Sequence, residues 1–150
     1  MEIERKYLIT SLPENITKYP FHFIEQGYLC TDPVIRIRRQ DDEYFLTYKS
    51  SGLMVREEYN LPLTATAYQQ LLHKIEGNLI RKKRYLIPLD HQLTIELDVF
   101  EAPFSPLILA EVEFPDEETA KGFIPLPWFG KDVTFSGKYH NSYLSSLIKP

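Results

Sequence analysis

Short blocks of aromatic and β-branched residues alternate with turn-forming residues along most of the chain. This spacing is typical of β-strands, and it predicts eight of them, at residues 2–9, 21–29, 34–40, 43–50, 54–61, 80–88, 93–100 and 107–114. The connections at 40–42, 50–52 and 90–92 are short enough for hairpins. Neighbouring strands should therefore be antiparallel and form a barrel or a sandwich.

Three segments depart from the strand period and follow a helical one. The first covers residues 64–76, where Thr64 or Thr66 can cap the helix, and the second opens at Asp116 and ends near Phe123. The third is an apolar stripe near the C-terminus, made of Tyr139, Tyr143, Leu144, Leu147 and Ile148. Few helices accompany many strands, so the predicted fold class is α+β, mainly antiparallel β.

Charged residues recur at every second position in most of the predicted strands. Side chains alternate between the two faces of a strand, so each set projects from one face. The opposite faces are rich in Ile, Leu, Val and Tyr, which is too apolar a surface to be left in water. We therefore expect helices or loops to cover the apolar faces, with the charged faces turned toward one another.

The charged set divides by strand, because strands 34–40 and 80–88 are basic while 93–100 and 107–114 are acidic. Carboxylates suit hard divalent cations, whereas Arg and Lys suit phosphate oxygens. A complex of a divalent metal with a polyphosphate could bind both the acidic and the basic strands. The acids are Glu2, Glu4, Glu58, Glu96, Asp98, Glu111 and Glu113, and the bases are Lys6, Arg36, Arg38, Lys49, Arg56, Lys82 and Arg84.

A simpler interpretation is that these charges form the solvated face of an ordinary antiparallel sheet, where exposed ion pairs contribute about 0.2–1 kcal/mol each. Two features favour a binding site instead. Like charges recur at positions i and i+2 within a strand, where they repel, and the apolar residues lie on the other face. Unfavourable electrostatic energy of this kind is concentrated at functional sites.

Composition narrows the classes of function. The chain has 150 residues, a formal net charge of −4 and one cysteine. This predicts one domain spanning 1–150 that needs no disulfide, and a cytoplasmic location. Net acidity argues against nucleic-acid binding, and no apolar run approaches the ~18 residues of a membrane span.

The N-terminal segment Glu2-Ile3-Glu4-Arg5-Lys6 resembles the E-x-E-x-K signature of the CYTH superfamily, the triphosphate tunnel metalloenzymes. The charged pairs of the later strands follow in the family's order, so the resemblance covers residues 2 to about 148. It is strongest to short bacterial members that hydrolyse inorganic triphosphate.

The resemblance implies an eight-stranded closed β-barrel, the triphosphate tunnel, with a few helices packed outside. By similarity, the triphosphate is bound by Lys6, Arg36, Arg38, Lys49, Arg56, Lys82 and Arg84. A first Mg²⁺ or Mn²⁺ is expected at Glu2, Glu4 and Glu113, and a second, which activates water, near the catalytic residues Glu58, Asp98 and Glu111. Glu96 completes the acidic set.

Several positions stay open at this stage. Asn60 stands where many relatives carry a second carboxylate, which puts the second metal's ligands in doubt. Lys138 is either part of a lid over the tunnel or an ordinary surface lysine. Gln26 and Tyr28 share a strand face that can point into the lumen, while Trp128 is expected to anchor its loop to the apolar exterior and the four histidines are expected at surface or structural positions.

The leading functional hypothesis is a metal-dependent triphosphatase that acts on inorganic triphosphate, with nucleoside triphosphates as poorer substrates. The sequence shows no constellation for a base or sugar, and discrimination between such ligands needs placed polar groups. A class IV adenylate cyclase and a non-catalytic polyphosphate-binding module are the alternatives, and thiamine triphosphate is a further substrate option. The protein is expected to be a monomer or a homodimer.

Overall fold

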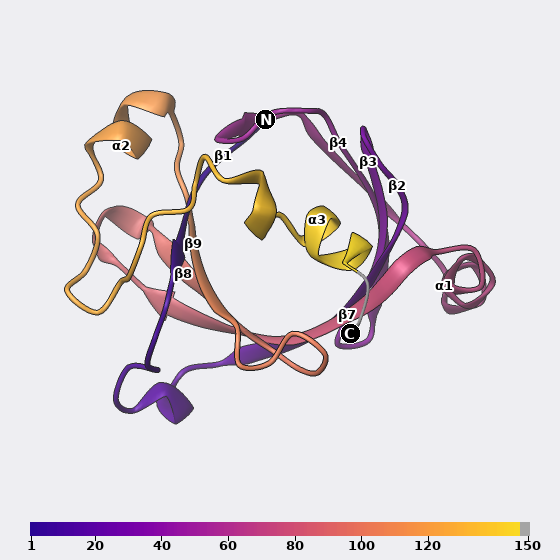
Figure 1. Ribbon diagram of the computed structural model, residues 1–150, viewed down its shortest axis with the longest axis horizontal. Coiled ribbons are helices and arrows are strands. Elements are labelled where there is room, and N and C mark those ends of the chain that lie inside the picture. The colour runs from indigo at the N-terminus through magenta and orange to yellow at the C-terminus, as the bar shows by residue number, and fades with distance from the viewer. Residues whose placement is uncertain (148–150) are drawn as a thin grey trace.

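The structure, a computed structural model, describes residues 1–147 and contains nine strands in one antiparallel sheet. The strands are β1 (Glu2–Leu8), β2 (Phe21–Thr31), β3 (Val34–Gln40), β4 (Glu43–Lys49), β5 (Val55–Arg56), β6 (Glu58–Pro62), β7 (Glu76–Pro88), β8 (Thr94–Phe100) and β9 (Ile108–Glu113). Their order in the sheet is β5-β1-β9-β8-β7-β2-β3-β4-β6, and the sheet curls into a ring (Figure 1). The mainly antiparallel barrel predicted from the sequence is confirmed.

The strand expected at 54–61 is divided in two at Glu57, which gives nine strands instead of eight. β5 pairs with β1, where Arg56 lies opposite Glu2, and β6 pairs with β4, where Glu58 lies opposite Lys49. The two ends of the sheet are thus joined by a single residue. Because the first part of the segment pairs with β1 and the second with β4, it brings the ring to near closure.

The helix α1 (Ala65–Leu72) packs outside the barrel on β3 and β4. The side chain of Thr64 caps it by accepting a hydrogen bond from the amide of Ala67 at 3.0 Å. The helix ends before the expected residue 76, because β7 begins there and Gly77 adopts a positive φ of 71°. Tyr68 is fully buried against Tyr44, with ring centroids 5.0 Å apart.

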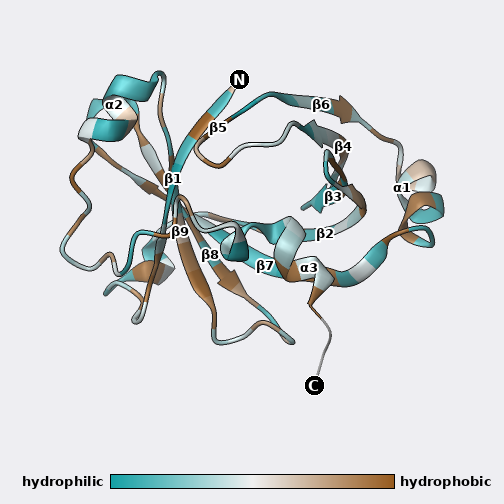
Figure 2. Ribbon diagram, turned by 45° about the horizontal axis from the view of Figure 1, so that its top comes forward, coloured by the Kyte–Doolittle hydropathy of each residue, from teal (hydrophilic) through white to brown (hydrophobic). Residues whose placement is uncertain are grey.

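The largest hydrophobic core lies on the outward face of β1, β8 and β9. It contains Tyr7, Leu97 and Val112, all fully buried, and is covered by α2 (Glu117–Gly122) and the loop that follows it. Trp128 packs against this cluster, as the sequence predicts. The apolar strand faces therefore point away from the lumen, and α2 presents a mainly hydrophilic surface to solvent (Figure 2).

The C-terminal helix α3 (Asn141–Ser146) differs from the expectation that the helices pack outside, because it lies across the ring (Figure 1). Its apolar side chain Leu144 packs with the inward-facing Ile80 and Leu109 at one end of the barrel. The backbone of α3 approaches β7 so closely that a Cβ at Gly77 would overlap the carbonyl oxygen of Ser145. The apolar stripe thus finds its partners inside the barrel, while Ile148 lies outside the described residues.

Within residues 1–147, no helix is long and apolar enough to cross a lipid bilayer.

Candidate functional site

Charged side chains on the inward strand faces line one cavity, with a volume of ≈ 480 Å³ that includes solvent at its mouth. Strand alternation places them there: Arg36 and Arg38 both line the cavity, and Ile37 between them is buried on the opposite face. The cavity is lined by all the basic residues predicted to bind phosphate, namely Lys6, Arg36, Arg38, Lys49, Arg56, Lys82 and Arg84. The structure therefore brings the predicted cations together.

Three of these cations have no carboxylate partner among the described residues: Arg36, Arg38 and Arg56. Arg36 donates to the hydroxyl of Thr47 at 3.1 Å, and its Nε has no hydrogen-bond partner although it is buried. Burial lowers the pKa of Arg38 to about 9, and repulsion from neighbouring guanidinium groups adds to the effect. Buried cations of this kind are costly unless an anion joins them.

The opposite wall is built around Asp98, which is completely buried. Its Oδ1 accepts a hydrogen bond from Nε of Arg84 at 2.7 Å. Its Oδ2 lies 2.6 Å from Nζ of Lys82, which is also completely buried. Burial alone would raise the pKa of Asp98, but Arg84 and Lys82 hold it below its ordinary value. This wall is a network of paired charges.

Two pairs of glutamates face each other directly across neighbouring strands. Glu4 on β1 lies opposite Glu113 on β9, and Glu111 on β9 lies opposite Glu96 on β8. Like charges in such positions destabilise a sheet. Burial, followed by repulsion from Glu111 and Glu2, raises the pKa of Glu4 well above its usual range. Burial and its acidic neighbours likewise raise the pKa of Glu113.

The donor set suits a hard divalent cation, because it supplies only carboxylate oxygens and its repulsion would be relieved by positive charge. Within residues 1–147, however, no three carboxylates, histidines or cysteines converge as the ligands of an assembled metal site would. Glu2 instead contacts Nζ of Lys49 at 3.0 Å. A bound ion would have to replace Lys49 as the partner of Glu2.

The residues predicted to hold a second metal are not gathered at one point. Asp98 and Glu111 share Arg84, at 2.7 and 3.8 Å. Glu58 lies beside Lys49 at 3.4 Å, on the wall formed by β4 and β6. Glu96 contacts Arg84 at 3.3 Å and, with Glu113, lines a separate hollow at the end of β8 and β9.

The C-terminal segment contributes oxygen atoms to the lumen that sequence patterns did not predict. Oδ1 of Asn141 accepts hydrogen bonds from Lys82 at 3.0 Å and from the side-chain amide of Gln26 at 3.1 Å. Nζ of Lys6 donates to the carbonyl oxygen of Tyr139 at 3.2 Å. This segment therefore occupies donors that are otherwise available to a phosphate.

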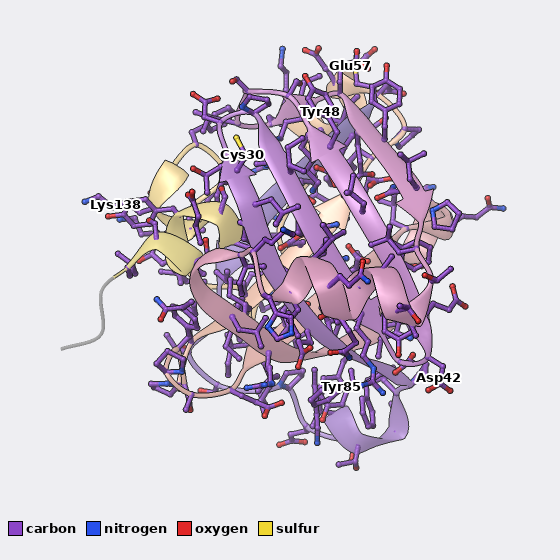
Figure 3. The ribbon with its side chains drawn as sticks, turned by 90° about the vertical axis from the view of Figure 1, so that its right-hand side faces the viewer. Cys30, Asp42, Tyr48, Glu57, Tyr85 and Lys138 are labelled. Atoms are coloured by element: carbon purple, nitrogen blue, oxygen red, sulfur yellow. The ribbon has the colours of Figure 1, made fainter. Side chains whose placement is uncertain are left out.

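His140 was expected to be a surface or structural histidine, but it lines the cavity beside Asn141. Burial, followed by repulsion from lumen cations, lowers its pKa to about 4. Gln26 and Tyr28 enter the lumen as their shared strand face predicts, and their side chains are hydrogen bonded at 3.2 Å. Lys138 is exposed at the edge of the molecule, so the structure gives it no contact with the cavity (Figure 3).

Comparison with known proteins supplies independent evidence. Residues 1–132 match the CYTH domain. The chain is 42% identical to an inorganic triphosphatase of Nitrosomonas europaea, over 98% of each chain. It is 32% identical to an inorganic triphosphatase of Acetivibrio thermocellus, over 95% of this chain and 92% of that protein.

Solved structures agree with the sequence comparison. The crystal structure of an inorganic triphosphatase that is 39% identical superposes with a TM-score of 0.75, covering 100% of this chain and 97% of the other. Both comparisons extend over the barrel and the charged lumen described above. The chain belongs to the CYTH domain family.

Proposed function

We propose that this protein hydrolyses inorganic triphosphate in a reaction that depends on Mg²⁺ or Mn²⁺. The observation that carries the proposal is the set of seven basic side chains around one cavity, three of which have no carboxylate partner in the described residues. A linear triphosphate is a small ligand with enough negative charge to neutralise such a wall. The family relatives named above as inorganic triphosphatases support the same reaction.

The basic side chains would bind and align the substrate. Arg36, Arg38 and Arg56 each use one guanidinium nitrogen in a hydrogen bond among the described residues, and their other nitrogens would donate to phosphate oxygens. Lys6 and Lys82 would exchange the C-terminal oxygens for phosphate. Positive groups fixed in a buried site stabilise charge on the transferring phosphoryl group and on the leaving pyrophosphate. Lys49 and Arg84 complete the proposed substrate-binding set.

The carboxylates would hold the cation, first at Glu2, Glu4 and Glu113 and then in a second set at Glu58, Asp98 and Glu111 with Glu96. A divalent cation in such a site neutralises phosphate charge and lowers the pKa of a bound water. The cross-strand pairing of Glu4 with Glu113 supports the first set. The second set requires Glu58 to act apart from the other two, because it lies on a different wall.

The test is the release of phosphate from inorganic triphosphate and from ATP, compared with Mg²⁺, with Mn²⁺ and with EDTA. Metal-dependent cleavage of inorganic triphosphate, faster than that of ATP, is expected. Arg38→Ala should weaken turnover through lost phosphate contacts, whereas Arg39→Ala, which alters the exposed neighbour on the outer face of β3, is the matched control. Equal activity of both variants would contradict the assignment of the lumen.

The same assay separates the alternatives. Cyclic AMP from ATP would indicate a class IV adenylate cyclase, and tight binding without turnover would indicate a polyphosphate-binding module. Thiamine triphosphate, tested as a third substrate, decides whether the activity extends to it. We further propose that the protein acts in the cytoplasm as a monomer or homodimer, with small-molecule partners only.

A further inference from the structure

His140 lines the lumen but belongs to neither the proposed substrate-binding set nor the proposed metal set. It lies where the chain enters α3, the helix that crosses the ring (Figure 1). Its backbone is fixed, because its amide donates to the carbonyl oxygen of Gly137 at 3.2 Å and its carbonyl oxygen accepts from the amide of Leu144 at 3.0 Å. Its side chain is not fixed in this way: within residues 1–147, neither ring nitrogen makes a hydrogen bond or an ion pair.

The other three histidines are not available to a ligand in the lumen. His22 lies 2.6 Å from a carboxylate oxygen of Asp41, and neither residue lines the cavity. His73 and His91 are exposed at positions outside the cavity. Among the described residues, the imidazole of His140 is therefore the one that a bound phosphate can contact.

Positive charge dominates the surroundings of this ring. The cations that face it are Lys6 from β1, Lys49 from β4 and Arg56 from β5, whereas the facing carboxylate is Glu111 from β9. A permanent cation at this position would be repelled by the three basic side chains, but an imidazole can avoid the repulsion by staying neutral. The other ionisable residues that line the cavity are Glu4, Tyr28, Arg36, Arg38, Glu58, Lys82 and Arg84.

A polyanion bound in the lumen would reverse this balance. Inorganic triphosphate carries several negative charges, so it would neutralise the cations around His140 and bring an opposite charge to the ring. An opposite charge within about 4–6 Å favours the protonated form of a histidine. The imidazolium then has two N–H donors, either of which can form a charge-assisted hydrogen bond with a phosphate oxygen.

The segment that carries His140 is anchored on both sides of it. Before it, Oγ1 of Thr134 accepts a hydrogen bond from the amide of Lys6 at 3.0 Å. After it, Leu144 is buried in the apolar cluster at one end of the barrel. A phosphate can therefore replace the side-chain oxygen of Asn141 as the partner of the lumen donors while the ring of His140 stays beside the site.

We infer that His140 is a further substrate-binding residue, which is neutral in the free protein and becomes a protonated phosphate ligand when inorganic triphosphate binds. The proton comes from the buffer and forms an N–H bond on the ring, and no other covalent bond changes. The inference rests on the proposed function, because it uses the same phosphate site. It predicts that binding takes up a proton, and that acid strengthens binding through this residue.

The test is calorimetry with inorganic triphosphate in EDTA, which prevents the metal-dependent turnover, at pH 6 in two buffers that differ in ionisation enthalpy. If binding raises the pKa of His140 from about 4 to its ordinary 6.5, the wild type should take up about 0.7 proton more than His140→Gln. The comparison with the variant is needed because phosphate groups themselves titrate near pH 6.

Affinity provides a second measurement. The wild type should bind triphosphate about three- to fourfold more tightly than His140→Gln at pH 6, and the two should differ little at pH 8, where the imidazole is neutral in both states. His140→Lys carries a permanent charge, so it should keep tight binding at both pH values without the additional proton uptake. His73→Gln, at an exposed position outside the cavity, is the matched control and should behave like the wild type.

Imidazole NMR of the wild type gives the same information if His140→Gln does not fold. The histidine that resists protonation in the free protein should titrate near or above pH 6.5 when triphosphate is bound. The inference is overturned if triphosphate leaves the titration of every histidine unchanged, or if the wild type and His140→Gln take up the same number of protons.

Proton uptake on binding does not require turnover, so the two proposals fail separately. Absence of triphosphate hydrolysis, with proton uptake that depends on His140, would overturn the proposed function alone. Hydrolysis of inorganic triphosphate, with equal proton uptake in the wild type and His140→Gln, would overturn the role of His140 alone.

Discussion

His140 links the stability of this protein to pH. It stands at the start of α3 and lines the lumen. Burial is the main cause that lowers its pKa to about 4, and the cations Lys6, Arg56 and Lys49 add to the effect, with a smaller opposing contribution from Glu111. The folded protein therefore favours the neutral imidazole.

The sign of the effect follows from the two pKa values. In the unfolded chain His140 has its ordinary pKa of 6.5, so between pH 6.5 and 4 the unfolded state binds more protons than the folded state. The stabilising contribution is therefore fully present above pH 6.5 and is lost as the pH falls toward 4. The full shift would correspond to a loss of about 2 kcal/mol at pH 5, since one pKa unit is about 1.4 kcal/mol, and solvent screening of the partly exposed ring reduces it to about 1 kcal/mol.

The assay is urea unfolding of the wild type and of His140→Gln at pH 7.5 and at pH 5. Phosphate-free buffers are needed, because an anion bound in the lumen would add its own stabilisation. The variant should lose about 1 kcal/mol less than the wild type between the two pH values. His73→Gln, at an exposed position after α1, is the control. Equal losses in wild type and His140→Gln would refute the reasoning.

Three further predictions concern the lumen. Asp98→Asn should destabilise the protein by about 3–5 kcal/mol in urea unfolding, because Lys82 is left buried without its carboxylate; a loss near zero would contradict the paired-charge network. Asn141→Ala should lower KM for inorganic triphosphate by roughly two- to tenfold, because phosphate would no longer have to displace the Asn141 oxygen that accepts hydrogen bonds from Lys82 and Gln26. An unchanged KM would show that this oxygen does not compete with the substrate. Glu4→Gln should abolish metal-dependent turnover and weaken Mn²⁺ binding. It should also raise the unfolding temperature in EDTA, because it removes a charge that repels Glu111 and Glu2. A folded variant with normal activity would contradict the metal site.

Much of the charged lumen was predictable because strand geometry is local. Side chains at i and i+2 share a face, so Arg36 with Arg38 and Lys82 with Arg84 had to project together once the strands were recognised. All four of these side chains line the cavity, as this alternation predicts. Asn60, which departs from the family pattern, lines a hollow together with Arg36 and Arg38.

The break at Glu57 and the position of α3 were not predictable in the same way. No glycine or proline marks residue 57, and the division between β5 and β6 arises because β1 and β4 bind adjacent parts of one segment. The C-terminal stripe indicates an amphipathic helix but not its partner. Leu144 meets Leu109 inside the barrel only because distant strands bring that apolar patch together.

The outward core explains how the barrel can keep so many charges in its lumen. In most sheets with one wet face, the apolar side chains pack inside and the charges face bulk water. Here the larger cluster of buried apolar side chains, which includes Tyr7, Leu97 and Val112, packs outward under α2 and the loop containing Trp128, so the main hydrophobic stabilisation does not depend on filling the lumen. Paired charges such as Asp98 with Lys82 hold one wall in place, and unpaired ones such as Arg38 remain available. Folding thus leaves a defined excess of positive charge for a polyanionic substrate to neutralise.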